Sequence, residues 1–441
     1  MAPDEARKTV VHHRDHGRAG ASTLSLVGTP PARRLARRAT LACLFLAAPL
    51  VSLAAASPVS SQTGSSQAAS GQAPSAVRAT PGPLTACWGR ERIAQWPLRR
   101  QIGGLVMVGI PISSAARAAA LVADLGLAGI LVRGAPTAGS RAALLTIAKA
   151  QTDVPTFVAV DEEGGRVQHL RGSAGVLPSA AVMAKTMTAA QVRDLAFKHG
   201  KAMRALGFTL DFAPILDLAN GNANGIGDRA WSTDPSVTAA YGLAFSQGLL
   251  DAGVFPVVKH FPGHGYANGD SHNLGVITPP IEVLRARDMV PFRQVFGQAR
   301  VGVMVGHLQV PGFSDVPATL SSRLITEVLR NELHFGGLVV TDSLSMWPIR
   351  YYFSAAHAAE LALRAGNDVL LYDDDPNVAS VIDSLTEVVQ ADPTLWPRVV
   401  DANLRVLAAK GLPICTPSTT ASTAATSSTV ISASSTTTVV P

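Results

Sequence analysis

Residues 256–265 read Pro-Val-Val-Lys-His-Phe-Pro-Gly-His-Gly, and this stretch decides the fold. Three apolar residues, typical of a short buried strand, run directly into Lys259 and His260, and the proline and glycines that follow prevent regular structure. Polar groups at the end of a buried strand cost free energy unless they are paired. The stretch therefore predicts a strand that delivers two basic side chains to one edge of a sheet, below a loop that carries Asp270 and His272.

Short apolar runs of the same kind recur along the chain, and amphipathic segments such as 189–206, 237–251 and 322–333 separate them. Regular alternation of strands and helices predicts a parallel sheet, and about eight such units in one domain predict a (β/α)8 TIM barrel. A doubly wound open sheet is the alternative, but residues 108–111 do not form the glycine-rich dinucleotide loop that it would need after its first strand. The expected strands are 105–108, 129–132, 156–160, 209–212, 256–258, 302–305, 338–340 and 368–371.

The barrel prediction also places the chemistry, because active sites of this fold lie at the C-terminal ends of the strands. Polar side chains follow several of the expected strands at this point. Scattered surface charges would not align in this way, although strand ends are often polar. The residues concerned are Asp161, Asp217, Lys259, His260, His307 and Asp342.

The net charge of +6 is concentrated at the N-terminus. Residues 1–40 contain eight Arg and Lys against three Asp and Glu, or +5, so the remaining chain is close to neutral and a nucleic-acid-binding surface is not supported. A charge-free apolar run at 41–53 and small residues at 54–57 follow, which predicts a signal peptide over 1–57 and an exported protein. The alternative is an uncleaved leader that tethers the protein to the membrane, although the run is shorter than the roughly 20 residues that span a bilayer.

Composition sets the remaining boundaries. Residues 58–86 are rich in Ser, Ala, Gln, Gly and Pro and predict a flexible linker, and 416–441 predict a disordered tail because sixteen of these residues are Ser or Thr and none is charged. The folded domain is then 87–415. Cys87 and Cys415 stand at its two ends and are its only cysteines, so they could pair after export; two unrelated thiols are the alternative.

Several motifs, in the same order along the chain, resemble glycoside hydrolase family 3 in its exo-β-N-acetylglucosaminidase branch, and the exported form with a linker resembles the actinobacterial members. The resemblance covers roughly residues 100–375. It rests on Val-Asp-Glu-Glu-Gly-Gly-Arg-Val (160–167), Leu-Asp-Phe-Ala-Pro-Ile-Leu-Asp-Leu (210–218), Ile-Gly-Asp-Arg (226–229), Lys-His-Phe-Pro-Gly-His-Gly (259–265), Asp-Ser-His (270–272), Val-Thr-Asp-Ser-Leu-Ser-Met (340–346) and Ala-Gly-Asn-Asp (365–368).

The resemblance implies a retaining glycosidase, with Asp342 as the nucleophile, His272 as the acid/base and Asp270 as the partner of that histidine. Histidine titrates near neutral pH, so it can protonate the leaving oxygen and later accept a proton from water. The usual second group of a retaining enzyme is instead a carboxylate. Two positions depart from the family: His169 replaces a common arginine, and Ser343 replaces a common aspartate.

Binding roles follow from the same motifs. The resemblance implies that substrate contacts come from Asp161, Arg229, Lys259, His260 and His307. Asp161 could alternatively cap a helix. Asp217 could bind sugar or anchor a loop, His264 is expected to shape its loop, and Glu162 and Glu163 are expected to be structural.

The implied activity is release of terminal GlcNAc from cell-wall fragments such as GlcNAc-MurNAc pieces and muropeptides, by a monomer that needs no cofactor. A phosphorylase, a β-glucosidase and an inactive protein that binds cell-wall glycans are the alternatives. A metal site built from His260, His264, Asp270 and His272 is less favoured, because a loop rich in proline and glycine fixes no shared face and Asp342 would have no role.

Overall fold

The computed structural model describes residues 88–151, 153–220, 225–271, 275–374 and 377–414 of the chain. Eight parallel strands form one sheet in the order β11-β9-β7-β6-β3-β2-β1-β12. A parallel bridge between Val340 and Val369 joins the two outer strands and closes the barrel. The strands are β1 (Val106–Pro111), β2 (Gly129–Arg133), β3 (Phe157–Val160), β6 (Leu210–Asp211), β7 (Phe255–Phe261), β9 (Gly302–Val305), β11 (Val339–Thr341) and β12 (Leu370–Tyr372). The predicted (β/α)8 barrel is therefore confirmed.

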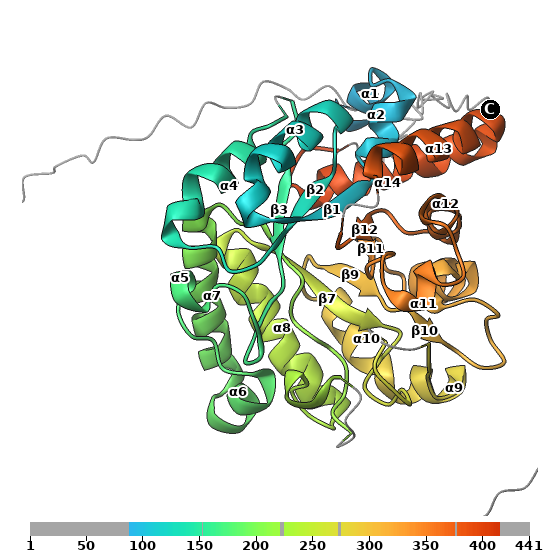
Figure 1. Ribbon diagram of the computed structural model, residues 1–441. Coiled ribbons are helices and arrows are strands. Elements are labelled where there is room, and N and C mark those ends of the chain that lie inside the picture. Colours follow the sequence, from blue (N-terminus) through green and yellow to red (C-terminus); the bar gives the residue numbers. More distant parts are fainter. Residues whose placement is uncertain (1–87, 152, 221–224, 272–274, 375–376, 415–441) are drawn as a thin grey trace, which may run out of the picture. The chain divides into compact units, whose positions relative to one another are not determined.

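Helices surround these strands, as Figure 1 shows. Four further strands, β4 (Glu162–Gly164), β5 (Val167–Gln168), β8 (Val276–Ile277) and β10 (Leu308–Gln309), form two small ribbons outside the barrel. Two further segments, Leu284–Asp288 and Arg323–Glu332, are π-helical. The α-helices are α1 (Trp88–Ala94), α2 (Leu98–Gly103), α3 (Ala115–Leu125), α4 (Arg141–Ala148), α5 (Arg171–Ala174), α6 (Ala180–Thr186), α7 (Ala189–Leu206), α8 (Pro235–Ala252), α9 (Ile281–Val283), α10 (Val290–Phe296), α11 (Trp347–Arg350), α12 (Ala355–Ala365), α13 (Val378–Ala391) and α14 (Trp396–Ala409).

Local sequence signals fix the ends of the two long helices. Helix α7 has the predicted bounds because Thr188 and Gln191 form a capping box at its start and Gly207 ends it in the left-handed conformation. Helix α8 begins two residues before the predicted range, since the Asp234 side chain accepts hydrogen bonds from the first turn and Pro235 occupies the first helical position.

The core has two layers separated by the strands. Val106 and Val108 of β1 pack outward against the helices, whereas Met107 points into the barrel and packs with Phe157 and Leu371. This alternation is the period-two pattern of a strand. The barrel interior is therefore filled with apolar side chains, and a binding site can form only at the ends of the strands.

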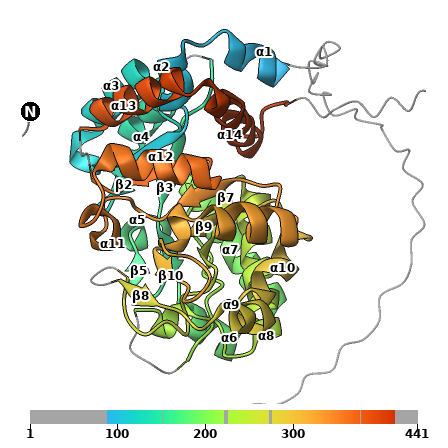
Figure 2. The same ribbon diagram turned by 90° about the vertical axis from the view of Figure 1, so that its right-hand side faces the viewer.

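The two ends of the described chain meet beside the barrel, where α2 lies next to α13 and α14 (Figures 1 and 2). The predicted leader, linker and tail, and the predicted pair Cys87 and Cys415, lie outside the described residues. Within the described part of the chain, no helix combines the length and the apolar character that crossing a bilayer requires.

Candidate active site

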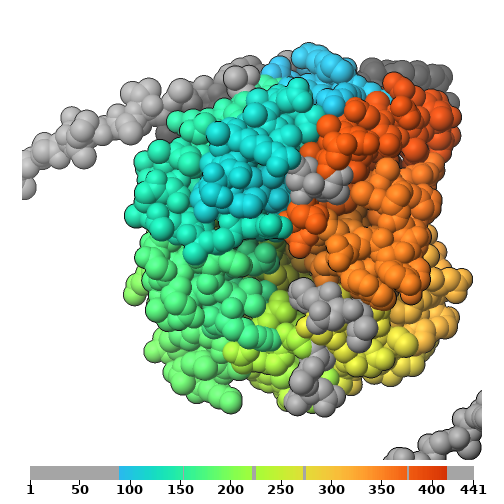
Figure 3. Space-filling view, in the orientation of Figure 1, coloured from blue at the N-terminus to red at the C-terminus, as the bar shows by residue number. Residues whose placement is uncertain are grey.

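A cavity of about 470 Å³ lies at the C-terminal ends of the barrel strands. Figure 3 shows this face hollowed between the green and orange segments of the chain. The loops after β3, β7, β11 and β12 bring residues that are far apart in sequence to its wall. Of the residues predicted to form the site, the lining includes Asp161, Arg229, Lys259, His260, Asp270 and Asp342.

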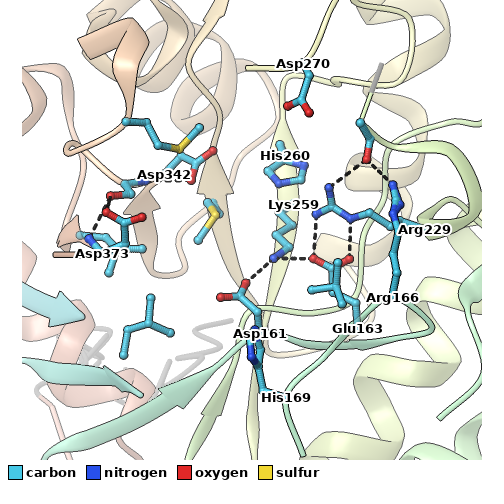
Figure 4. A pocket seen from close by; sticks show the side chains of 17 residues that line it. Asp161, Glu163, Arg166, His169, Arg229, Lys259, His260, Asp270, Asp342 and Asp373 are labelled. Carbon is cyan, nitrogen blue, oxygen red and sulfur yellow. Dashed lines mark hydrogen bonds and ion pairs between the residues drawn. The ribbon is translucent and has the colours of Figure 1, made fainter. Parts of the chain in front are cut away.

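A buried ion-pair network forms one wall of the cavity (Figure 4). The Lys259 ammonium lies 2.6 Å from Asp161 Oδ1 and 2.8 Å from Glu163 Oε1. Glu163 also accepts two hydrogen bonds from the Arg229 guanidinium, of 2.7 Å from Nε and 2.8 Å from Nη2. Asp161 is the open end of the network, because its side chain is 28% exposed whereas that of Glu163 is 4% exposed.

The charges of this network support one another. Burial alone would raise the pKa of Glu163, but the neighbouring Lys259 and Arg229 lower it to about 2. Burial alone would lower the pKa of Lys259, but the carboxylates of Asp161 and Glu163 raise it above its usual range. Glu163, Lys259 and Arg229 are therefore ionised at neutral pH, and the network presents fixed hydrogen-bonding groups to the cavity.

Sequence reasoning interpreted Glu163 as structural, and its position shows more than that. Its carboxylate holds both Arg229 and Lys259 in place, and it also lines the cavity. Glu162 matches the structural expectation. It is buried, its Oε2 accepts hydrogen bonds from the backbone N–H groups of His169 and Leu170, and its Oε1 pairs with a histidine of α7.

Asp217 orients His260 from behind the cavity. Its Oδ2 lies 2.6 Å from His260 Nδ1, and its Oδ1 accepts a 2.6 Å hydrogen bond from the backbone N–H of His264. Burial would raise the pKa of Asp217, but the two histidines lower it, so Nδ1 of His260 is the donor. Of the two roles left open for Asp217, the structure shows the anchoring of a loop.

The loop after β7 is fixed at its base by buried contacts. His264 Nε2 lies 3.0 Å from Ser271 Oγ, which agrees with the expected role of His264 in shaping this loop. Asp270, which directly precedes Ser271, lines the cavity beside Gly225. A Cβ atom at position 225 would lie 2.8 Å from Asp270 Cγ. Gly225 also has a φ of +84°, so glycine is required at this position. His272, the predicted acid/base, lies outside the described residues.

Asp342 lies directly after β11, on the side of the cavity opposite to Arg229 (Figure 4). Its backbone N–H donates to the Val305 carbonyl at 2.9 Å, which extends the pairing of β11 with β9. Its Oδ1 accepts a 2.8 Å hydrogen bond from the Ser343 backbone N–H. These contacts fix a carboxylate at the rim, facing the ion-pair network.

Sequence reasoning did not single out two charged residues of the lining. Asp373 follows β12, and its Oδ1 accepts a 2.9 Å hydrogen bond from Ser343 Oγ; the same strand-end rule that selected Asp342 could have found it. Arg166 stands within a quoted motif, and its guanidinium holds Asp228 at 3.1 Å and the Ile226 carbonyl at 2.9 Å. Arg166 thereby supports the segment that carries Arg229.

His307 follows β9, as the sequence predicts, but it is not among the residues that line the cavity with Asp342. It is buried, and it lines a second cavity instead of the one that contains Asp342. Its Nδ1 lies 2.8 Å from Thr319 Oγ1, and its Nε2 donates to the Ser343 carbonyl at 2.7 Å. A substrate contact by His307 would have to replace one of these bonds. Among the described residues, no group of three or more His, Cys, Asp or Glu side chains is arranged to hold a metal ion.

Comparison with known proteins adds an independent finding. The family profile described as "Glycosyl hydrolase family 3 N terminal domain" matches residues 97–409. A protein named beta-hexosaminidase LpqI, from Mycobacterium tuberculosis, is 42% identical over 383 residues, which cover 84% of this chain and 97% of that protein.

Solved structures agree with the sequence match. A glycosyl hydrolase of the same family from Mycobacterium smegmatis superposes with a TM-score of 0.69 at 42% identity, covering 73% of this chain and 99% of that one. A β-N-acetylglucosaminidase of the family from a Paenibacillus species superposes with a TM-score of 0.66 at 30% identity, covering 72% of this chain and 63% of that one.

Proposed function

Because this chain belongs to glycosyl hydrolase family 3 and is a glycosidase, we propose that it is a retaining exo-β-N-acetylglucosaminidase that removes terminal GlcNAc from cell-wall fragments. The relatives named beta-hexosaminidase and β-N-acetylglucosaminidase support this choice of sugar. The observation that carries the proposal is the placement of Asp342 across one cavity from the network of Asp161, Lys259 and Arg229.

The network is the group that would grip the terminal sugar. Asp161 presents a partly exposed carboxylate that can accept hydrogen bonds from two neighbouring hydroxyl groups. Lys259 and Arg229 can donate to hydroxyl oxygens, and His260 can add a contact through Nε2 because Asp217 occupies Nδ1. A rigid, ionised network of this kind orients one ring without reorganising when the sugar binds.

Asp342 would attack the anomeric carbon and form a covalent glycosyl-enzyme intermediate, as a retaining mechanism requires. The Ser343 N–H holds one oxygen of this carboxylate and limits its rotation. His272 would protonate the departing oxygen in this step and deprotonate water in the second step, with Asp270 as its partner. Asp270 lines the same cavity as Asp342, which is the placement that this pairing needs.

Initial rates on aryl β-N-acetylglucosaminide and aryl β-glucoside, each with and without phosphate, test the proposal. We expect turnover of the N-acetylglucosaminide alone, with free GlcNAc as the product at every phosphate concentration. Formation of a sugar phosphate would instead identify a phosphorylase, and turnover of the glucoside would identify a β-glucosidase. A folded protein that binds cell-wall fragments without turning over either substrate would be a binding protein.

A further inference from the structure

An ion pair between two adjacent residues lies beside the loop after β7. Arg287 and Asp288 end the π-helical segment 284–288, and adjacent side chains of a helix normally point apart. Here the guanidinium folds back over its neighbour: Nε donates to Asp288 Oδ2 at 2.9 Å, and Nη2 lies 2.9 Å from the same oxygen. The Asp288 side chain is 1% exposed and that of Arg287 is 30% exposed. The pair therefore holds a long, half-buried side chain in one orientation.

The buried carboxylate depends on this arginine. Burial raises the pKa of Asp288 to about 6; Arg287 opposes the rise, and the nearby Asp217 adds to it. Asp288 is therefore largely ionised at neutral pH. Its Oδ1 has no hydrogen-bond partner among the described residues. A buried charge that loses its partner costs several kcal/mol, roughly 3–5, so the pair favours an arginine that stays in place.

The guanidinium that is held in this way lies on the loop. Its Cζ is 3.5 Å from the centroid of the Tyr266 ring, well inside the roughly 6 Å within which a ring face attracts a cation. At the start of the same loop, a Cβ atom at position 263 would lie 2.5 Å from Asp288 Cβ, and Gly263 has a φ of +127°. The loop therefore packs against the ion pair at two points, Gly263 and Tyr266.

Two other anchors hold the loop on either side of Tyr266. His264 and Ser271 close its base, with 3.0 Å between Nε2 and Oγ. On the far side of Tyr266, the Asn268 N–H donates to the Ile277 carbonyl of β8 at 3.0 Å. The turn that carries Tyr266 lies between these anchors, and the cation against its ring fixes the side that faces the π-helical segment.

We propose that Arg287 is a positioning residue for the acid/base step, and that it acts by holding Tyr266 so that Asp270 keeps its place at the cavity wall. This inference rests on the proposed function, in which Asp270 is the partner of the acid/base. Asp270 belongs to the same loop and directly precedes Ser271, so a displaced turn at Tyr266 would displace it. Arg287 is not among the described residues that line the cavity, so its effect on the reaction passes through the loop.

The kinetic test compares Arg287→Gln with Arg285→Gln. Arg285 is the matched control, because it stands in the same π-helical segment and also combines an ion pair with a ring contact, but its partners Glu332 and Phe313 lie outside the loop. The probes are the β-1,4-linked GlcNAc disaccharide, whose leaving oxygen needs a proton, and dinitrophenyl β-N-acetylglucosaminide, whose leaving group does not.

We expect Arg287→Gln to lower kcat/KM about tenfold for the disaccharide, the size of one lost cation–π contact in a half-buried setting, and to change it less than about twofold for the dinitrophenyl glycoside. Arg285→Gln should leave both values unchanged. A loss of equal size on both probes would refute the role of Arg287 in the acid/base step, and so would an equal loss in the control variant.

Two substitutions of Tyr266 separate its ring from its hydroxyl group. Tyr266→Phe keeps a ring face for the guanidinium and should retain the wild-type rates, whereas Tyr266→Leu should reproduce the selective loss of Arg287→Gln. Equal losses in the two variants would show that the hydroxyl group, not the contact with Arg287, supports the reaction, and would refute the inference.

Backbone hydrogen exchange tests the anchor separately from the chemistry. Arg287→Gln should speed exchange in peptides that cover residues 264–271, and Arg285→Gln should not. Unchanged exchange in Arg287→Gln would refute the anchor even if the proposed function is correct. Wild-type enzyme that hydrolyses neither probe would refute the proposed function, and with it the role in the acid/base step, whatever the exchange shows.

Discussion

Two buried carboxylates, one at each end of the barrel, show how similar ion pairs serve different purposes. Glu163 lies after β3 at the C-terminal end, and Asp368 lies before β12 at the N-terminal end. Both are buried, both bind arginine, and the neighbouring cations lower the pKa of each against the opposing effect of burial. By residue type, burial and charge alone, the two groups are nearly indistinguishable.

The difference lies in what the partners touch. Asp368 accepts hydrogen bonds of 2.7 Å from Arg330 and 2.6 Å from Arg398, and one of 2.8 Å from the backbone N–H of Val339. This last bond links the start of β12 to β11, where the barrel closes. The partners of Glu163 instead lead to the partly exposed Asp161 at the cavity wall. A buried charge is therefore evidence of a site only where its network opens to a cavity.

The strongest test of this distinction removes Asp342, the proposed nucleophile, from the open end. Asp342→Asn should lower kcat at least about 10³-fold, because the amide cannot form the glycosyl-enzyme intermediate. The side-chain shape is retained, so binding of GlcNAc should persist and the midpoint of urea unfolding should change little. Steady-state kinetics, calorimetric titration and urea unfolding check the three statements. Activity within about tenfold of the wild type would exclude Asp342 as the nucleophile.

The acid/base assignment predicts a loss that depends on the leaving group. His272→Ala should reduce kcat/KM about 10²–10⁴-fold for the β-1,4-linked GlcNAc disaccharide, whose leaving oxygen needs a proton. The loss should be far smaller for dinitrophenyl β-N-acetylglucosaminide, which has an activated leaving group. Asp270→Asn is the companion variant and should show the same dependence more weakly. Rates on a series of aryl glycosides of rising leaving-group pKa measure it. Equal losses across the series would refute the assignment of His272.

At the closed end we predict a loss of stability without a loss of chemistry. Asp368→Asn leaves the surrounding arginines without their buried carboxylate, so the free energy of unfolding should fall by about 3–5 kcal/mol. Asp401→Asn is the control, because Asp401 binds Arg398 and Arg405 but its side chain is 48% exposed, and its effect should stay below about 1 kcal/mol. Thermal and urea unfolding measure both. A reduced kcat/KM in folded Asp368→Asn protein would contradict the distinction between a structural ion pair at this end and a functional one at the cavity.

The strands were predictable because each is a short apolar run bounded by turns. Each of the eight strands begins or ends within two residues of its predicted boundary. The rule that active-site residues lie at the C-terminal ends of the strands also predicted that Lys259 and Asp342 lie at one rim, and both line the cavity there. This rule does not predict whether a side chain that follows a strand lines the cavity or points away from it. His307 and Asp373 both follow strands, yet His307 turns toward Thr319 and the Ser343 carbonyl, whereas Asp373 lines the cavity.

The role of Glu163 could not be predicted from local sequence, because its partners are distant in sequence. Its partners Arg229 and Lys259 are far along the chain, and only the closed barrel brings three loops together. Local patterns identify which residue types stand at strand ends, but they do not show which charges pair. The placement of His272, and the pairing of Cys87 with Cys415, remain predictions from sequence.

Acid unfolding tests the open end alone. The pKa of Glu163 is lowered from 4.5 to about 2 in the folded protein, so its contribution to stability is fully present above pH 4.5 and is lost as the pH falls toward 2. Glu163→Gln should therefore destabilise the protein at neutral pH, and the difference from the wild type should shrink through this range. Glu327→Gln, an exposed control, should show no such trend. Urea unfolding from pH 7 down to about 3 measures the difference, and a constant gap would mean that Glu163 is not held ionised by Lys259 and Arg229.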